Sequence, residues 1–478
     1  MSGETLRFAV VGHPNEGKSS VVSTLAEDDS VPVSAIPGET VVCKSYPVRI
    51  DGKEIVDFID TPGFQNPVYT REWMLEHGGD GEELLQAFID VHESQPDFHH
   101  DVELLKPIAA GAGIIYIVDG SRPVRAPDRA EMDILRKTGR TRMAIINCKD
   151  EEIDYRADWE LSFRQNFNAY RVFNAHHATY RERIDLFGAL KGVNPSWQDT
   201  MEEVIAAFKK DWQARTRNAA DVIVDLLEKN VVYKKSKSLG KGADPAELTE
   251  KLLAAYQKKL SETEQRAHGE LRSIFKHNLL RSNLEPHDLL QDDLFSERTW
   301  HLLGLKKNQL IMASALAGAA GGLGVDALLA GSSFGLFAAG GAAVGAISAY
   351  FGGEGLAGSL GKGGGLFGRW LGGKQVSVGP VKSPQLYFIL LDRALLYHDY
   401  VIHWAHGRRN GGNEELSDDP ADHDEQKVGY VVDFTEDERK ACSQHFKHVL
   451  KGDRGDIEES RNEVVALLVR VLNEQSEQ

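Results

Sequence analysis

Short apolar runs alternate with longer amphipathic segments over about the first 195 residues. Each apolar run ends at a polar turn, and segments of helix length separate the runs. The runs open the stretches LRFAVVGHPNEGKSS, KEIVDFIDTPG, GIIYIVDGS, RMAIINCKD and AYRVFNAHH. This alternation predicts a wound, mostly parallel α/β sheet.

The pattern changes to a helical period in residues 196–300, where apolar residues recur at spacings of three and four. Asp244-Pro245 is typical of a helix start. The helix that follows can bury one face, formed by Leu248, Leu252, Tyr256, Leu260, Leu271, Phe275 and Leu279. We expect a helical stalk or bundle, with a partner helix as the alternative neighbour of this face.

Residues 310–353 form an Ala/Gly-rich ribbon with one charged residue, Asp326. Its halves, 310–329 and 334–351, each approach the roughly 20 residues that cross a bilayer. We expect a hydrophobic helical hairpin whose lysine- and arginine-bearing flanks stay in the cytoplasm. Because alanine and glycine supply little transfer free energy, a hairpin buried in protein and an oligomerisation element remain open alternatives.

The chain returns to ordinary helical patterns after the ribbon. Residues following Pro384 predict a buried or interfacial helix, and residues 411–430 read as an acidic linker. Thr435 and Glu438 have capping-box spacing, so residues 431–478 are expected to form C-terminal helices.

Charge and cysteine content narrow the class of protein. The 478 residues carry 72 acidic and 55 Lys or Arg side chains, for a net charge of −17, which makes nucleic acid an unfavourable partner. Cys43, Cys148 and Cys442 are too few and too dispersed for a disulfide framework or a zinc site. No signal-peptide pattern precedes the first expected strand, so we expect a cytoplasmic protein.

The first expected strand leads into GHPNEGKSS, which has the phosphate-binding spacing Gly12-x4-Gly17-Lys18-Ser19. Glycines let backbone N–H groups converge on a phosphate, and the helix that starts near Ser19 and Ser20 adds its positive end. We expect Lys18 to reach the β- and γ-phosphates and Ser19 to ligate Mg²⁺, with Asn15 and Glu16 also in the nucleotide-binding loop.

Two later strand ends complete the candidate site. In DTPG, Asp60 would reach Mg²⁺ through water, and the Gly63 N–H would sense the γ-phosphate. In NCKD, the carboxylate of Asp150 can accept from guanine N1–H and N2–H₂, while Asn147 bridges the base edge and the loop, with Lys149 between them. Guanine is therefore favoured over adenine.

With these motifs, residues 5–192 resemble the Era and TrmE-like group of translation-factor-related GTPases. Further elements of the resemblance are Thr40 in IPGET and the weaker pair Asn174-Ala175. The resemblance implies a Mg²⁺-dependent GTP hydrolase in which Thr40 ligates Mg²⁺ in the triphosphate state and Ala175 touches guanine through its backbone. Lys18, Thr40 and Gly63 are then the expected catalytic residues.

The resemblance also bears on how hydrolysis is activated. Asn15 stands where TrmE-like GTPases carry an asparagine that binds K⁺, which implies K⁺-stimulated hydrolysis, although Glu39 beside Thr40 weakens this expectation. In those relatives two GTPase domains must meet, which implies a homodimer of this chain. Phe64 replaces the glutamine that orients the attacking water in Ras-like proteins, and Cys148 replaces the lysine of NKxD, whose ammonium braces the phosphate loop.

About forty residues separate DTPG from the next expected strand. We interpret residues 65–107 as an insertion after switch II and expect a mobile partner-binding or regulatory arm. Its histidines lack the paired spacing of a metal site; they are His77, His92, His99 and His100.

These expectations combine into one organisation: a GTPase domain (1–195), a helical stalk (196–300), the hairpin with its following helix (301–410), the linker (411–430) and the C-terminal helices (431–478). A resemblance to a bacterial group with a GTPase head and a C-terminal domain of unassigned function agrees with this order. We expect a GTP-hydrolysing switch that binds GTP and GDP and works at the cytoplasmic face of the inner membrane, through residues 301–374. The alternatives are a GTP-gated scaffold with weak turnover and an RNA- or ribosome-associated GTPase.

Overall fold

The computed structural model describes residues 5–27, 40–50, 53–147, 155–175, 178–240, 243–276, 290, 294–295, 299, 375–381, 384–403 and 429–477. The hydrophobic ribbon, residues 411–428 of the acidic linker, Glu39 and Cys148 lie outside these residues. The chain divides into two compact units, and the boundary after Ala214 falls within one long helix.

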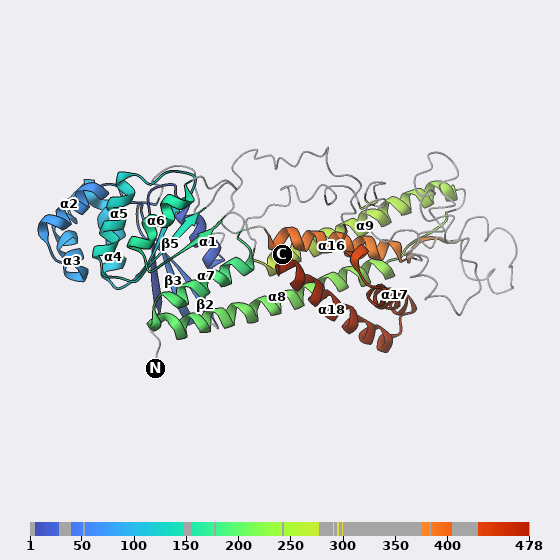
Figure 1. Cartoon of the computed structure of the whole chain (residues 1–478). Helices are drawn as coiled ribbons and strands as arrows, with labels where there is room; N and C mark the ends of the chain where they lie inside the picture. Colours follow the sequence, from blue (N-terminus) through green and yellow to red (C-terminus); the bar gives the residue numbers. More distant parts are fainter. Residues whose placement is uncertain are drawn as a thin grey trace, which may run out of the picture. The chain divides into compact units, whose positions relative to one another are not determined.

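The first unit is built on a six-stranded sheet with the order β2-β3-β1-β4-β5-β6 (Figure 1). The strands are β1 (Leu6–Val11), β2 (Lys44–Ile50), β3 (Lys53–Asp60), β4 (Gly113–Asp119), β5 (Arg142–Asn147) and β6 (Ala169–Phe173). All neighbours pair in parallel except β2 and β3, which are antiparallel. The expected mostly parallel α/β fold is confirmed.

Sequence reasoning missed β2, the edge strand. Its sequence KSYPVRI alternates Tyr46, Val48 and Ile50 with polar residues or proline, which is a strand signal. Pro47 cannot donate to a ladder, so it fits an edge position. The missed strand leaves the phosphate-binding side of the sheet unchanged.

Helices cover both faces of the sheet (Figure 1). They are α1 (Lys18–Ala26), α2 (Pro67–His77), α3 (Gly81–His92), α4 (His99–Ala109), α5 (Ala126–Lys137), α6 (Arg156–Asn166) and α7 (Tyr180–Val193), with short 3₁₀ turns η1 (Pro96–Phe98) and η2 (Pro195–Trp197). One face packs against α1, α7 and the start of α8 (Gln198–Val232), and the other against α2 to α6. Alternate residues of β1 point to the two cores, since Phe8 and Val10 join one and Ala9 and Val11 the other.

The segment after DTPG forms α2, α3, η1 and α4, and it packs onto the sheet instead of standing apart as an arm. Met74, Leu85, Phe88 and Leu105 are fully buried in the core on that face. Aromatic rings join these elements, with Trp73 and Phe88 at 5.4 Å and Tyr69 and Phe98 at 4.8 Å between ring centroids.

The second unit is mainly helical. It contains the later part of α8, α9 (Pro245–Ile274), α16 (Gln385–Ile402), α17 (Glu436–Lys451) and α18 (Arg454–Glu477), with the turn η3 (Val431–Asp433) and an antiparallel pair of β7 (Lys235–Ser238) and β8 (Gln375–Val378). The expected helix starts are confirmed: α9 begins at Pro245, and the Thr435 side chain accepts from the Glu438 N–H at the start of α17.

Ion pairs connect the helices of the second unit, one of them buried and the others partly exposed. Arg393 of α16 pairs with Glu264 of α9 at 2.6 Å. Arg461 of α18 binds three acidic residues of α8: Asp221 at 3.2 Å, Asp225 at 2.8 Å and Glu228 at 3.1 Å. Five residues of the predicted apolar face of α9 are buried: Leu252, Tyr256, Leu260, Leu271 and Phe275. Leu248 is half-buried, and Leu279 lies outside the described residues.

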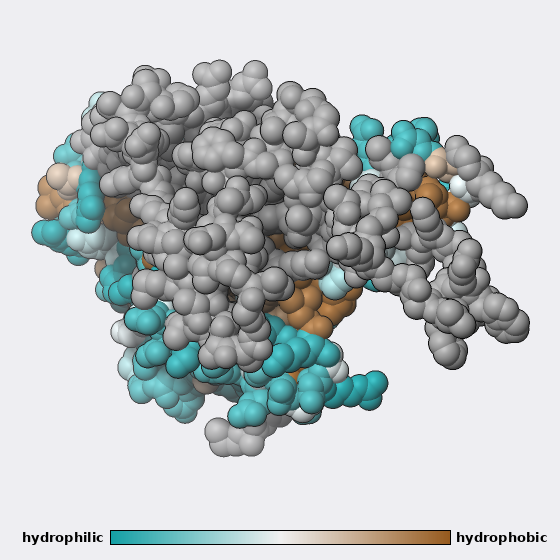
Figure 2. Space-filling model, turned by 90° about the vertical axis from the view of Figure 1, so that its right-hand side faces the viewer, coloured by the Kyte–Doolittle hydropathy of each residue, from teal (hydrophilic) through white to brown (hydrophobic). Residues whose placement is uncertain are grey.

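The described surface is mainly hydrophilic on the side shown in Figure 2, with hydrophobic residues exposed in a few places. Within the described part of the chain, none of the helices is both long enough and apolar enough to span a bilayer.

Candidate nucleotide site

The loop between β1 and α1 has the backbone that the phosphate-binding spacing predicts. Gly12 and Gly17 adopt φ values of 149° and 88°, in the region that favours glycine. A Cβ on Gly12 would lie 2.3 Å from the Ile117 carbonyl oxygen, and one on Gly17 would lie 2.2 Å from Nδ2 of Asn147. Both glycines are therefore required by close contacts, and Asn15 also takes a positive φ of 68°.

Lys18 and Ser19 are the first residues of α1. The Lys18 ammonium donates to the His13 carbonyl oxygen at 3.0 Å, so the lysine side chain folds back along its own loop. Burial lowers the pKa of Lys18, and the carboxylates of Asp60, Glu131 and Glu16 act in the opposite direction. Ser20, the next residue, is buried at the positive end of the helix.

The structure brings together Ser19, Thr40 and Asp60, which the sequence assigns to Mg²⁺. The hydroxyls of Ser19 and Thr40 donate to Oδ2 of Asp60 at 2.8 and 3.5 Å. Asp60 is 1% exposed, burial raises its pKa, and its Oδ1 has no hydrogen-bond partner among the described residues. Two hydroxyls and a carboxylate with an unused oxygen fit the oxygen ligands that Mg²⁺ prefers.

Gly63 contacts the phosphate loop directly. A Cβ on Gly63 would lie 2.6 Å from Cδ of Pro14, so a larger residue would push the two loops apart. Thr61 donates to the Val10 carbonyl oxygen at 2.7 Å, which fixes DTPG beside β1. Phe64 is fully buried in the core beneath α2 to α4.

On the base side, Asn147 connects two loops. Its Nδ2 donates to the Glu16 carbonyl oxygen at 3.0 Å, and its Oδ1 accepts from the Ala175 N–H at 3.2 Å. Asn174 and Ala175 follow β6, and the Ala175 carbonyl accepts from Thr24 of α1 at 3.0 Å. Lys149 and Asp150 lie outside the described residues, so the predicted guanine contact stays a prediction.

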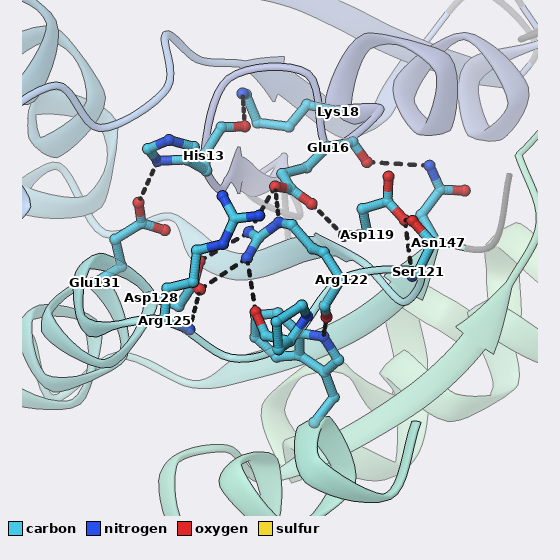
Figure 3. A network of polar contacts seen from close by, with 12 residues as sticks. His13, Glu16, Lys18, Asp119, Ser121, Arg122, Arg125, Asp128, Glu131 and Asn147 are labelled. Atoms are coloured by element: carbon cyan, nitrogen blue, oxygen red, sulfur yellow. Dashed lines mark hydrogen bonds and ion pairs between the residues drawn. The ribbon is translucent and has the colours of Figure 1, made fainter. Parts of the chain in front are cut away.

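A polar network lies beside the phosphate loop, and sequence reasoning missed it (Figure 3). Glu16 lies in the predicted nucleotide-binding loop, and its carboxylate pairs with Arg122, which also binds Asp128. His13 contacts the fully buried Glu131 at 3.1 Å, and Glu131 also accepts from the Tyr116 hydroxyl at 2.9 Å. The hydrogen bond to Glu131 raises the pKa of His13. A charged residue inside the phosphate loop was the signal that could have indicated a partner elsewhere in the chain.

The helices after DTPG contact both loops expected to respond to nucleotide. The Asn66 N–H donates to Asp101 of α4 at 3.2 Å, and the Cys43 thiol donates to the Glu103 carbonyl of α4 at 3.1 Å. Within the described part of the chain, no group of three His, Cys, Asp or Glu side chains that could hold a metal ion occurs. His92 is buried against Phe88, with ring centroids 4.2 Å apart, so this histidine packs in the core.

The sheet order, the phosphate loop and the Ser19–Asp60 pair define a P-loop GTPase domain. In agreement, residues 7–148 match the family described as 50S ribosome-binding GTPase. Residues 161–470, more than half of the chain, match the family described as Domain of unknown function (DUF3482). The chain belongs to the DUF3482 family.

Individual relatives share the GTPase part. GTPase Der of Aromatoleum aromaticum is 24% identical over 202 residues, 42% of this chain and 40% of that protein. GTPase Der of Desulforudis audaxviator is 45% identical over 69 residues, 14% of this chain and 16% of that protein. The chain thus spans less than half the length of these curated relatives.

Solved structures of Era are also similar to this chain. Era in complex with MgGDPNP and nucleotides 1506–1542 of 16S ribosomal RNA is 15% identical and covers 57% of this chain and 89% of its own, with a TM-score of 0.27. A variant of Era from Aquifex aeolicus, bound to GDP and AlF4⁻, is 16% identical over 57% of this chain and 90% of its own, also with a TM-score of 0.27.

Proposed function

We propose that the first unit binds GTP with Mg²⁺ and hydrolyses it to GDP and phosphate, as a switch that controls the helical C-terminal part. The observation that carries this proposal is the convergence of Ser19 and Thr40 on the buried carboxylate of Asp60, next to Lys18. When bound, Mg²⁺ would neutralise charge on the β- and γ-phosphates, held by Ser19, Thr40 and, through water, Asp60.

In this proposal the chain's own groups act mainly by positioning and electrostatic stabilisation. Lys18 leaves the His13 carbonyl to bind phosphate oxygens, and the N–H groups of the loop and the α1 start bind the phosphates. The Gly63 N–H donates to the γ-phosphate, while Asp150 accepts from guanine. Thr40 and Gly63 respond to the γ-phosphate, and the residues shortly after each of them contact α4: Cys43 bonds to Glu103, and Asn66 bonds to Asp101. A change at the γ-phosphate is therefore passed to α4.

Water activation needs a group other than Phe64, whose side chain is fully buried. Asn15 is exposed at the tip of the phosphate loop and is our proposed K⁺ ligand, with a second GTPase domain completing the site in a homodimer. The buried Phe64 equally supports the second candidate, a GTP-gated scaffold with very slow turnover.

Single-turnover GTP hydrolysis in K⁺ and in Na⁺ tests both candidates. We expect turnover to be faster in K⁺ and to rise with protein concentration. Turnover that is negligible in both salts at all concentrations, with tight GTP binding retained, would support the scaffold instead.

The substitution K18A tests the site itself. It removes a cation that would bind phosphate, so we expect the dissociation constant for GDP to rise on the order of 100-fold, about 3 kcal/mol. The control is K191A, which removes a surface lysine of α7 paired with Glu202. Equal affinities of K18A and the unmodified chain would show that the loop does not bind the phosphates.

We also propose that residues 301–374 bind a membrane or a membrane protein, which would place the chain at the cytoplasmic face of a membrane. The support is the ribbon's sequence with its basic flanks. Flotation with anionic liposomes, with GDP or a non-hydrolysable GTP analogue, tests this against a variant lacking residues 310–353. Absence of flotation in both nucleotide states would leave a buried hairpin or an oligomer interface.

A further inference from the structure

Arg122 lies in the turn between β4 and α5 and contacts three separate elements (Figure 3). Its Nε donates to Oε1 of Glu16 at 2.7 Å, and its Nη2 forms an ion pair with the same oxygen at 2.6 Å. Its Nη1 and Nη2 donate to the two carboxylate oxygens of Asp128 at 2.8 Å each. Because the guanidinium is planar and contacts two carboxylates at once, its orientation is fixed. A lysine ammonium in the same place would not be oriented in this way.

The third contact joins Arg122 to α6. Its guanidinium lies over the Trp159 ring, 5.2 Å from the ring centroid, and its carbonyl oxygen accepts from the Trp159 indole N–H at 2.8 Å. Helix α6 follows the NCKD segment along the chain. One residue therefore ties the phosphate loop to the helix that continues from the base-reading loop.

Both the carboxylate and the backbone carbonyl of Glu16 accept hydrogen bonds. Its carboxylate accepts from Arg122 and from the Asp119 N–H, and its carbonyl oxygen accepts from Asn147 at 3.0 Å. Glu16 is 3% exposed, so its charge lies away from water. Removing Arg122 would leave a buried carboxylate without a cation, which is costly. The loop must then rearrange or take up a proton.

The position after Asn147 supplies no cation, because it is Cys148. Glu16 and the two glycines are parts of one loop, since Gly17 and Lys18 follow Glu16 directly. A contact that fixes Glu16 thus fixes the backbone N–H groups beside it without touching a ligand.

We propose that Arg122 is a positioning residue for the nucleotide: by holding Glu16 against α5 and α6, it keeps the phosphate loop in its ligand-binding form before the nucleotide arrives. This inference rests on the proposed function of the loop. A loop that is already in its ligand-binding form loses less entropy on binding. Without Arg122, a smaller fraction of the protein would have the loop in that form and be able to bind. The expected signature is a slower association rate with a nearly unchanged dissociation rate.

The test measures association and dissociation of a fluorescent GDP analogue with Mg²⁺, using the full chain and the variants R122M, R122K and E16Q/R122M. We expect R122M to raise the dissociation constant at least 10-fold through slower association. R122K should raise it several-fold, because one ammonium cannot replace the several N–H donors of the guanidinium. The double variant should recover part of the loss, since it no longer leaves Glu16 charged without a partner. The kcat at saturating GTP should stay within about twofold of the unmodified value in R122M and R122K.

The matched control is R183M, which breaks another buried ion pair of the first unit. Arg183 of α7 binds Glu27 at 2.6 Å, with the two side chains 6% and 3% exposed, at the opposite end of α1 from the phosphate loop. R183M should lower the melting temperature but leave the dissociation constant within about twofold.

The inference fails if R122M, or R122K should R122M not fold, binds the analogue within twofold of the unmodified chain. It also fails if R183M weakens binding as much as R122M, since the effect would then reflect general stability. No binding by the unmodified chain would instead overturn the proposed function.

Discussion

The loop after β1 and the loop after β3 meet at one site but differ in what they leave available. In the first, the Lys18 ammonium donates to a carbonyl of its own loop and Asn15 is exposed, while the Glu16 carboxylate is buried and bound to Arg122. In the second, Asp60 keeps an oxygen that no described residue binds, but Phe64 is sealed in the core and Asn66 is bonded to α4. The comparison teaches that the two loops keep groups that fit the proposed binding of phosphate and Mg²⁺, whereas the side chain at position 64, directly after DTPG, is part of the core.

The largest expected effect concerns Phe64. Truncation in F64A should lower the free energy of unfolding by about 3–5 kcal/mol, because it leaves a cavity in the core, while F64L should cost less than about 1.5 kcal/mol. GTP turnover of F64L should match the unmodified chain. Urea unfolding and turnover assays check this, with F163A as the control, since Phe163 is fully buried in the same core. Loss of turnover in F64L without loss of stability would break the comparison, because Phe64 would then act in the chemistry.

The next effect concerns Asp101, which accepts the Asn66 N–H. Burial raises the pKa of Asp101 from 3.8 to about 6, against the effect of the backbone hydrogen bonds from Asn66 and Gln65. A raised carboxyl pKa favours the protonated form in the folded state. Its stabilising contribution is therefore present below pH 3.8 and is lost as the pH rises through about 6.

The variant D101N removes this titration. Between pH 4 and pH 7, the unfolding free energy of the unmodified chain relative to D101N should fall by up to about 3 kcal/mol, at ~1.4 kcal/mol per pKa unit. Urea unfolding at several pH values measures the difference, and D97N provides a control in the neighbouring 3₁₀ turn. Parallel pH profiles of the unmodified chain and D101N would show that folding does not raise the pKa of Asp101.

The smallest effect concerns the Asn66 side chain, whose Nδ2 donates to the Asp97 carbonyl at 2.7 Å on the exposed side of the same junction. N66A should lower the free energy of unfolding by about 1 kcal/mol and leave GDP affinity unchanged. A thermal melt and a nucleotide titration measure the two quantities. A strong loss of affinity in N66A would mean that the second loop contributes to binding as much as the first.

Much of this site follows from adjacent residues. The spacing of Gly12, Gly17, Lys18 and Ser19 dictates a loop closing on a helix start, and strand ends in a parallel sheet share one edge, which brings Asp60 and Asn147 near it. The fold class follows in the same way from the apolar runs. Short-range geometry was sufficient for these parts.

Contacts between distant residues could not be predicted in this way. Arg122 lies 106 residues from Glu16, and Asp101 lies 35 from Asn66, so each pair depends on how a helix packs against the sheet. The sequence after DTPG showed that this segment is long, but it did not show where its helices lie. The burial of the segment on the sheet depends on the apolar faces of three helices, α2, α3 and α4, packing together. Sequence alone does not show which way a loop side chain turns, so it could not indicate that the Glu16 carboxylate pairs with Arg122.

The long helix α8 has a consequence for dividing the protein experimentally. Its early residues Met201, Val204 and Phe208 belong to the core of the first unit, and its later residues Ile223 and Leu227 are buried beyond the boundary at Ala214. A truncation on either side of that boundary removes apolar side chains from one unit or leaves an apolar helical stub on the other. Fragments of either unit should therefore be produced with the whole of α8, and the exposed half of that helix replaced by polar residues to keep the fragment from aggregating.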